Sequence, residues 1–182
     1  MKNHTLAQEV ELKLPLVDKK TTLQKLHDLK AVFISEVKQR DYLYNSSFYS
    51  FVERDEALRL RHELSGSNEK VYVTYKGPAT FSPTGHKIRD EYEVTVSDFI
   101  IMKQILEALQ FEKAAIVEKV RATYQLDGIM VAIDTLPFGE FIELEGDAQK
   151  SERVRHQLGL STVEPIKKGY IVLQKEWERK NN

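Results

Sequence analysis

Charged and aliphatic residues alternate in one short stretch after another along this chain, and this alternation most restricts how it can fold. In a β-strand, Glu9-Val10-Glu11-Leu12-Lys13 would point its charged side chains to one face and its aliphatic side chains to the other. The pattern returns at residues 58–61, 73–76, 88–96, 119–122 and 141–145. One such strand would usually present its charges to solvent, but the recurrence predicts that the charged faces are gathered in one place.

The strands expected from this pattern are joined mainly by hairpins. They cover residues 9–14, 34–44, 58–63, 71–76, 87–96, 114–126, 129–136 and 140–145. Asp127-Gly128 is a strong signal for a tight hairpin turn, and Ser65-Gly66-Ser67-Asn68 predicts another turn. Residues 45–56 are expected to form a loop with one short extended piece.

Helical periodicity is confined to the segments between and after these strands. Asp18 is expected to cap a first helix and Ser97 a second. The apolar stripe of the first helix consists of Leu23, Leu26, Leu29 and Val32, and that of the second of Ile101, Ile105, Leu106 and Leu109. Gly146-Asp147 opens a third helix that ends near Gly159, and Pro165 starts a last one. We therefore expect one α+β domain over residues 1–182, with strands at about 9–146 and C-terminal helices at about 147–180.

Composition excludes several classes of protein. With 41% hydrophobic and 30% charged residues, the chain has the balance of a soluble globular protein. Its 27 basic and 28 acidic residues give a net charge of −1, so no bulk field favours nucleic acid or an anionic membrane as partner. The absence of cysteine excludes disulfides and thiolate zinc sites. No apolar run has the length of a membrane span and no signal-peptide pattern opens the chain, so we expect a cytoplasmic monomer or homodimer.

Closure of the strands into a barrel would place the apolar faces outside, under helices, and the charged faces around a lumen. That lumen would hold Glu9, Glu11, Lys13, Arg59, Arg61, Lys76, Arg89, Glu91, Glu93, Lys119, Arg121, Glu143 and Glu145. Keeping so mixed a set dry is costly unless the cavity binds a polyanion together with hard cations. Guanidinium and ammonium groups match phosphate oxygens, while clustered carboxylates suit Mg²⁺ or Mn²⁺. The charges therefore predict a triphosphate site.

At these motifs the chain resembles a known family. Glu9-Val10-Glu11-Leu12-Lys13 is similar to the ExExK signature of the CYTH superfamily, the triphosphate tunnel metalloenzymes. Further matches follow in the family's order at residues 57–61, 74–78, 87–93, 118–121 and 139–145. The resemblance covers roughly residues 9–146. It implies a closed, eight-stranded antiparallel barrel with a charged lumen and flanking helices, and an enzyme that depends on a divalent metal.

Carried over position by position, the resemblance implies a role for each charged residue. The residues expected to hold Mg²⁺ or Mn²⁺ are Glu9, Glu11, Asp134, Glu143 and Glu145. Those expected to bind the triphosphate are Lys13, Arg59, Arg61, Lys76, Arg89, Lys119 and Arg121. Those expected to take part in catalysis are Lys13, Glu91 and Glu93, of which the two glutamates would order water or a second metal.

Within the family the chain is most similar to class IV adenylyl cyclases, with thiamine triphosphatases and inorganic triphosphatases as relatives. In a cyclase the 3′-hydroxyl of ATP attacks the α-phosphorus and pyrophosphate leaves, whereas in a triphosphatase water attacks the terminal phosphorus of ATP, thiamine triphosphate or tripolyphosphate. The tunnel motifs serve both reactions. Some class IV cyclases carry His-Phe six and five positions before the first signature glutamate, where this chain has Asn3-His4.

Two other classes of function remain open at this point. One is a non-catalytic binder of polyphosphate or nucleotide, although a pure anion binder would be better off without the carboxylates. The other is a helix-covered β-domain for protein association, with its charges on an exposed sheet.

Several conspicuous side chains have an ordinary structural interpretation. The five histidines show no metal-ligand spacing, and His62 has the parity of an outward-pointing residue. Tyr170 and Trp177 are expected to pack rather than to stack on a ligand, with a C-terminal lid over the tunnel mouth as the alternative. Asp41, Tyr42 and Tyr44 remain open between base recognition and packing.

Overall fold

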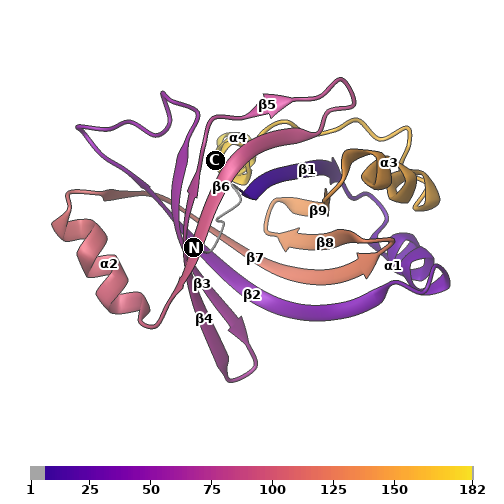
Figure 1. The fold of residues 1–182 in the computed structure, drawn as a ribbon, viewed down its shortest axis with the longest axis horizontal. Helices are drawn as coiled ribbons and strands as arrows, with labels where there is room; N and C mark the ends of the chain where they lie inside the picture. Colours follow the sequence, from indigo (N-terminus) through magenta and orange to yellow (C-terminus); the bar gives the residue numbers. More distant parts are fainter. Residues whose placement is uncertain (1–6, 182) are drawn as a thin grey trace, which may run out of the picture.

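The predicted strands pair side by side until the sheet closes on itself (Figure 1). The computed structural model describes residues 7–181. Its eight long strands are β1 (Ala7–Pro15), β2 (Val32–Asn45), β3 (Ala57–Ser65), β4 (Asn68–Lys76), β6 (Lys87–Val96), β7 (Glu112–Leu126), β8 (Ile129–Leu136) and β9 (Gly139–Glu145). Their order is β1-β9-β8-β7-β2-β3-β4-β6, and β1 also pairs with β6, which closes the barrel. All of these pairings are antiparallel, so the fold class is confirmed.

Local turn chemistry behaves as expected at the hairpins. Asp127 and Gly128 both have positive φ angles, 52° and 78°, which is the geometry that a two-residue hairpin turn requires between β7 and β8. A two-residue turn also joins β3 to β4, with Gly66 at φ 59°. A short strand, β5 (Thr80–Phe81), pairs with β6 in the segment between the expected strands at 71–76 and 87–96.

Helices cover the apolar outer faces of the barrel. α1 (Lys19–Asp28) and α3 (Ala148–Gln157) lie at the end of the molecule opposite α2 (Phe99–Ala108) (Figure 1). A core that includes Leu12, Leu144 and Val154 joins β1, β9 and α3, and these side chains are fully buried. A second core forms under α2, where Leu106 packs with Leu60 and Val71 of the sheet. The aliphatic side of the alternation is therefore the outside of the barrel.

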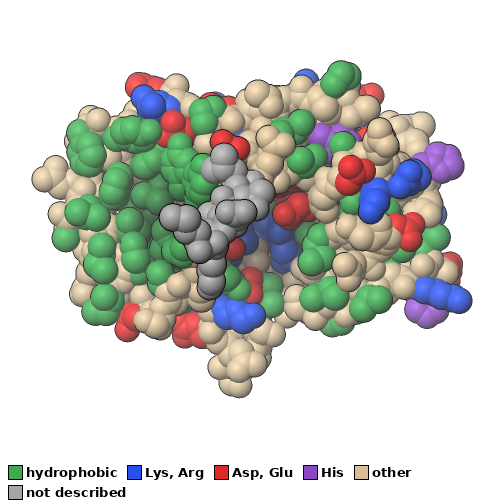
Figure 2. Space-filling model, in the orientation of Figure 1, with side chains coloured by type: hydrophobic (Ala, Val, Ile, Leu, Met, Phe, Trp, Pro, Cys, Tyr) green, Lys and Arg blue, Asp and Glu red, His purple; other side chains and the backbone are tan. Residues whose placement is uncertain are grey.

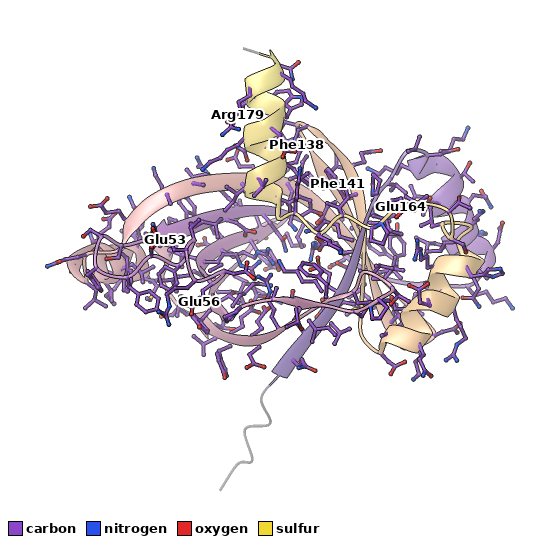
Figure 3. All side chains as sticks on the ribbon, turned by 90° about the horizontal axis from the view of Figure 1, so that it is seen from above. Glu53, Glu56, Phe138, Phe141, Glu164 and Arg179 are labelled. Carbon is purple, nitrogen blue, oxygen red and sulfur yellow. The ribbon has the colours of Figure 1, made fainter. Side chains whose placement is uncertain are left out.

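The first turn of α4 (Tyr170–Asn181) closes one end of the barrel, and its later residues Gln174, Trp177 and Glu178 line a pocket with the outward-facing Arg40 and Glu118. Tyr170 and Leu173 pack with Leu43, Val117 and Phe141, whose strand positions share the inward parity of the charged residues. Figure 3 shows the helix standing on the barrel, with Phe138 and Phe141 beside its first turns. None of the helices described, in residues 7–181, is long and apolar enough to cross a membrane.

Three boundaries differ from the expectation. Asp98, not Ser97, caps α2, because its carboxylate accepts a hydrogen bond from the Ile101 N–H. Val32 begins β2 instead of extending the first helical stripe, since α1 ends at Asp28. The last helix begins at Tyr170, and before it the Ile166 N–H donates to the Lys13 carbonyl, which holds that segment extended along β1.

The loop at residues 45–56 contains turns but no strand of its own beyond Asn45. Asn3-His4, the position of the cyclase-type His-Phe pair, lies outside the described residues.

Candidate active site

The charged residues expected in the lumen make close contacts with one another or stand beside each other in the strand register, except Arg61, whose partner is Asp41. The set comes from β1, β3, β4, β6, β7, β8 and β9, so its convergence depends on barrel closure. Figure 2, in the orientation of Figure 1, shows Lys, Arg, Asp and Glu side chains at the bottom of a hollow near the middle of the molecule. The structure thus brings together all of the candidate site residues.

Glu9 lies between two cations at one part of this network. Its carboxylate accepts from Lys76 Nζ and from Arg89 Nε, each at 2.7 Å. Lys76 Nζ also lies 2.5 Å from Glu91. Burial alone would raise the pKa of Glu9, but the two cations outweigh it and hold that pKa well below its usual range. Glu91 has the opposite balance, since burial and the charge of Glu9 raise its pKa.

Asp134 is a fully buried acceptor for three donors. Lys119 Nζ lies at 2.8 Å, Arg121 donates through Nε at 2.7 Å and Nη2 at 2.5 Å, and the Tyr170 hydroxyl donates at 2.8 Å. Arg121 also forms an ion pair with Glu143, which in turn lies 3.1 Å from Lys13 Nζ. This hub links β1, β7, β8 and β9 through one continuous set of ion pairs.

Burial lowers the pKa of Lys119 to about 8, and the charge of Arg121 adds to that effect. Lys13 is also buried, yet its carboxylate neighbours Glu11 and Glu143 outweigh the burial and raise its pKa. Two lysines in one cavity therefore differ in how firmly they hold their protons.

Arg61 and Asp41 form a buried, two-pronged ion pair. Arg61 donates from Nε at 2.6 Å and from Nη2 at 2.7 Å to the two oxygens of Asp41. Burial alone would raise the pKa of Asp41, but Arg61 and Arg59 lower it well below its usual range. Asp41 is therefore a lumen residue, while Tyr42 and Tyr44 pack outside the barrel in the core under α2.

Arg59 is only partly satisfied by the protein. Its Nη2 donates to Thr74 at 3.1 Å and to Glu93 at 3.2 Å, and Thr74 donates to the same Glu93 oxygen at 2.7 Å. Its Nε is buried and has no hydrogen-bond partner among the described residues. A buried guanidinium N–H without an acceptor is costly, and an anionic ligand would supply that acceptor.

Lys87 belongs to the lumen but was not among the expected site residues. It shares the parity of Arg89 and Glu91 on β6, and it is the register partner of Glu11. Within residues 7–181 it has no ion pair, and burial together with the charges of Arg89 and Lys13 lowers its pKa to about 8. The alternation that identified Arg89 would also have found Lys87, two positions earlier.

Glu11 and Glu145 are the carboxylates least occupied by cations. They lie opposite each other in the β1–β9 register, and Glu11 has one ion pair, to Lys13 at 3.4 Å. Glu145 is exposed on one side, and partial loss of solvent on the other side, together with repulsion from Glu9, Glu11 and Glu91, raises its pKa. A cluster of carboxylates that repel one another suits a hard divalent cation in its donor chemistry. Among the side chains of residues 7–181, however, no three carboxylates or imidazoles already converge at metal-ligand spacing.

Tyr170 reaches the site from α4, for which packing or a lid over the tunnel mouth was expected. Its ring lies 4.2 Å from Lys13 Nζ and 4.8 Å from Lys119 Nζ, and it makes an edge contact with Phe141 at 5.2 Å. No spacing rule relates a helix residue at 170 to strands at 13, 119 and 134, so the sequence offered no signal for this contact. Trp177, by contrast, stays outside the lumen, 41% exposed, beside Phe138.

The four histidines within residues 7–181 lie away from the carboxylate network. His62 stacks on Phe99 of α2 at 5.1 Å, which confirms that it points outward. His86 is fully buried between the β5–β6 segment and α3, where its ring contacts Thr84 at 2.9 Å and Ser151 at 3.2 Å. It ties these two segments together.

Comparison with known proteins agrees with this geometry. The family model described as the CYTH domain matches residues 7–170. A Methanocaldococcus jannaschii protein provisionally named adenylate cyclase is 33% identical over 177 residues, which cover 91% of this chain and 98% of that protein.

Among solved structures, a Pyrococcus horikoshii protein has a TM-score of 0.78 and 27% identity over 92% of this chain and 98% of its own. A Hippeastrum protein has a TM-score of 0.70 and 16% identity over 93% of this chain and 95% of its own. That protein was assigned provisionally as an adenylyl cyclase and found to have a dominant triphosphatase activity.

Proposed function

The chain belongs to the CYTH domain family, and from this premise we propose that it is a divalent-metal-dependent enzyme that acts on a triphosphate inside the barrel. One observation carries the proposal. Lysines and arginines from several strands surround one lumen, and there the buried Nε of Arg59 and the ammonium group of Lys87 have no partner in the described protein. A polyanion would satisfy both groups.

The residues proposed to bind the triphosphate are Lys13, Arg59, Arg61, Lys76, Arg89, Lys119 and Arg121, to which we add Lys87. Most of them are now paired with carboxylates, so phosphate oxygens would compete with those carboxylates for the same donors. The carboxylates hold the basic side chains in place before the substrate arrives, so these side chains need to reorganise less when it binds.

The residues proposed to hold Mg²⁺ or Mn²⁺ are Glu9, Glu11, Asp134, Glu143 and Glu145. Glu11 and Glu145 are the best placed, because Asp134 and Glu143 already accept hydrogen bonds from Lys119, Arg121 or Lys13. A bound cation would supply neutralisation of the phosphate charge. The other steps of binding and orientation fall to the chain's own basic residues.

The first candidate reaction is cyclisation of ATP. The 3′-oxygen would form a bond to the α-phosphorus, the bond from that phosphorus to the bridging oxygen would break, and pyrophosphate would leave as the 3′-hydroxyl proton passed to a base. Glu91 is proposed as the base that accepts that proton, since burial and the charge of Glu9 raise its pKa. The relative at 33% identity, provisionally named adenylate cyclase, supports this reaction.

The second candidate is hydrolysis of the terminal phosphate from ATP, thiamine triphosphate or tripolyphosphate. Here water would attack the terminal phosphorus, and the remaining diphosphate would be the leaving group. Glu93 and Thr74, hydrogen-bonded to each other beside Arg59, are proposed to orient that water. The dominant triphosphatase activity found for the Hippeastrum protein, which shares the fold, supports this second reaction.

A product assay on the purified chain separates these reactions. ATP, tripolyphosphate and thiamine triphosphate are each incubated with Mg²⁺ or Mn²⁺ and the products are resolved by chromatography. Cyclic AMP with pyrophosphate identifies a cyclase, and orthophosphate without a cyclic product identifies a triphosphatase. Tight triphosphate binding without turnover would replace the enzyme with a sensor, and absence of both would refute the tunnel proposal.

A further inference from the structure

α2 exposes an apolar surface on the side that faces away from the barrel. Its inner residues Phe99, Met102 and Leu106 pack on the sheet. Yet Ile101 and Ile105 on its outer side are 53% and 46% exposed. Of the ten residues of this helix only Lys103, Gln104 and Glu107 are polar. A helix that is apolar almost all round is normally buried on all sides.

The same surface continues onto the neighbouring strand. Tyr92 and Val94 of β6 are 47% and 60% exposed, and Val94 pairs in register with Val73, which is part of the core under α2. Figure 2 shows hydrophobic side chains gathered on the left of the view, over α2 and the strands beside it. We call this surface the α2–β6 face and define it as Tyr92, Val94, Ile100, Ile101, Ile105 and Leu109.

The α2–β6 face is as large as the largest apolar patches of ordinary monomers and approaches the size of a protein interface. Its six side chains are each about half exposed, so at about 200 Å² for a fully exposed side chain of this size they offer roughly 600 Å² of apolar surface. That is the upper end of the largest apolar patch found on ordinary monomers, about 300–600 Å². With its polar rim it approaches the roughly 800 Å² that each partner buries in a stable complex.

We propose that the α2–β6 face is the contact between two copies of this chain in a symmetric dimer. The positions on α2 are symmetric about Ile105. In an antiparallel pairing about a two-fold axis there, Ile101 lies at the level of the partner's Leu109 and Lys103 at the level of the partner's Glu107. Each opposite pair then occurs twice, as a two-fold interface requires.

The rim charges favour a second copy over a lipid surface. Lys103 and Glu107 already form an ion pair at 3.6 Å across one helical turn. Their signs balance, whereas a helix that lies on an anionic membrane carries an excess of lysine and arginine beside its apolar face. The face is also separate from the lumen, because Tyr92 and Val94 have the parity opposite to Glu91 and Glu93.

The mass of the full chain in solution tests the proposal. Sedimentation velocity and light scattering should give about twice the chain mass of 21.1 kDa. The double variant Ile101→Glu with Ile105→Glu should shift the species to a single chain while keeping the circular dichroism spectrum. A matched control, Val32→Glu with Ile34→Glu, places the same charges on exposed apolar positions of β2 and should remain a dimer.

Cross-linking tests the register independently of stability. Because the chain contains no cysteine, Ile105→Cys introduces a single thiol, which should form a covalent dimer on oxidation. Val32→Cys should not. A wild-type protein that sediments as a monomer at all concentrations tested, or cross-linking that is no stronger at position 105 than at 32, would overturn the proposal. Triphosphate binding measured in parallel reports on the lumen alone, so either result can occur without the other.

Discussion

Tyr170, a residue of the last helix, donates its hydroxyl hydrogen to Asp134, which lies inside the barrel, at 2.8 Å. The same ring lies beside the ammonium groups of Lys13 and Lys119. The helix that closes one end of the barrel is therefore coupled to the charge network of the site through a single side chain.

Removal of that hydroxyl should weaken the network without collapsing it. We expect Tyr170→Phe to cost about 1.5–3 kcal/mol of unfolding free energy, as for a hydrogen bond to a charged group. Tyr170→Ala also removes the ring and should cost about 3–5 kcal/mol. Urea unfolding followed by fluorescence measures both. Equal losses for the two variants would show that the hydroxyl, and not the ring, is what matters.

Loss of Arg59 should abolish tight triphosphate binding. Arg59→Ala removes a guanidinium whose buried Nε has no acceptor among residues 7–181, and we expect a fall in tripolyphosphate affinity of about 100-fold, or about 2.7 kcal/mol. Arg40→Ala serves as control, because Arg40 is half-exposed on the outer face of β2 and pairs with Glu118. Titration calorimetry compares the two. Equal affinities would place the polyanion somewhere other than the lumen.

Metal binding should depend on the carboxylates that repel one another. We expect Glu145→Gln and Glu11→Gln each to weaken Mn²⁺ binding at least 10-fold, measured by paramagnetic relaxation of water protons. Glu118→Gln changes an exposed carboxylate outside the barrel and should have no effect.

Because burial and its neighbours raise the pKa of Glu145, acid should weaken the binding of Mn²⁺ at a higher pH than for an ordinary glutamate. A pH dependence unchanged in Glu145→Gln would contradict this assignment.

The affinity for triphosphate should fall as the pH rises through about 8. Lys87 and Lys119 both have a pKa lowered to about 8, and only their protonated forms attract phosphate. Affinity is therefore full below this value and declines above it. The double variant Lys87→Arg with Lys119→Arg should keep its affinity to a higher pH, since arginine stays charged. A decline that persists unchanged in the variant would assign the titration to another group.

The buried pair of Arg61 and Asp41 should matter for stability as well as for charge. Asp41→Ala leaves the Arg61 guanidinium buried without its carboxylate, and we expect a loss of about 3–5 kcal/mol. Glu118→Ala removes a solvent-exposed partner of Arg40 and should cost at most about 1 kcal/mol. A loss at Asp41 as small as that at Glu118 would mean that water reaches the lumen and solvates Arg61.

Alternation of side chains was enough to predict the strands and, on the condition that they close, most of the lumen, because strand parity is a local property of the chain; the closed eight-stranded barrel itself was implied by the family resemblance. Glu9, Arg59 and Glu143 were identified in this way, and their contacts confirm that they converge. The alternation does not show which segment packs at the ends of the barrel. Tyr170 was missed because its position depends on where a whole helix packs.

Asp41 was left open for a related reason. The residue before Asp41 on the same face of the strand is Gln39, which is neutral, so the alternation of charged residues is interrupted there. Only the pairing of β2 with β3, which sets Asp41 opposite Arg61, shows that this carboxylate belongs to the site. The roles of these residues in a reaction remain predictions from the family resemblance.

The closed end formed by α4 affects how substrate enters the barrel and how products leave it. If one opening is occupied by Tyr170, Phe141 and their neighbours, substrate and products share the other. The phosphate tail must then enter first and the organic group must trail behind it toward solvent. The product formed deepest in the lumen, pyrophosphate after cyclisation or orthophosphate after hydrolysis of the terminal phosphate, would leave last, and we expect it to compete with incoming substrate for the same cations.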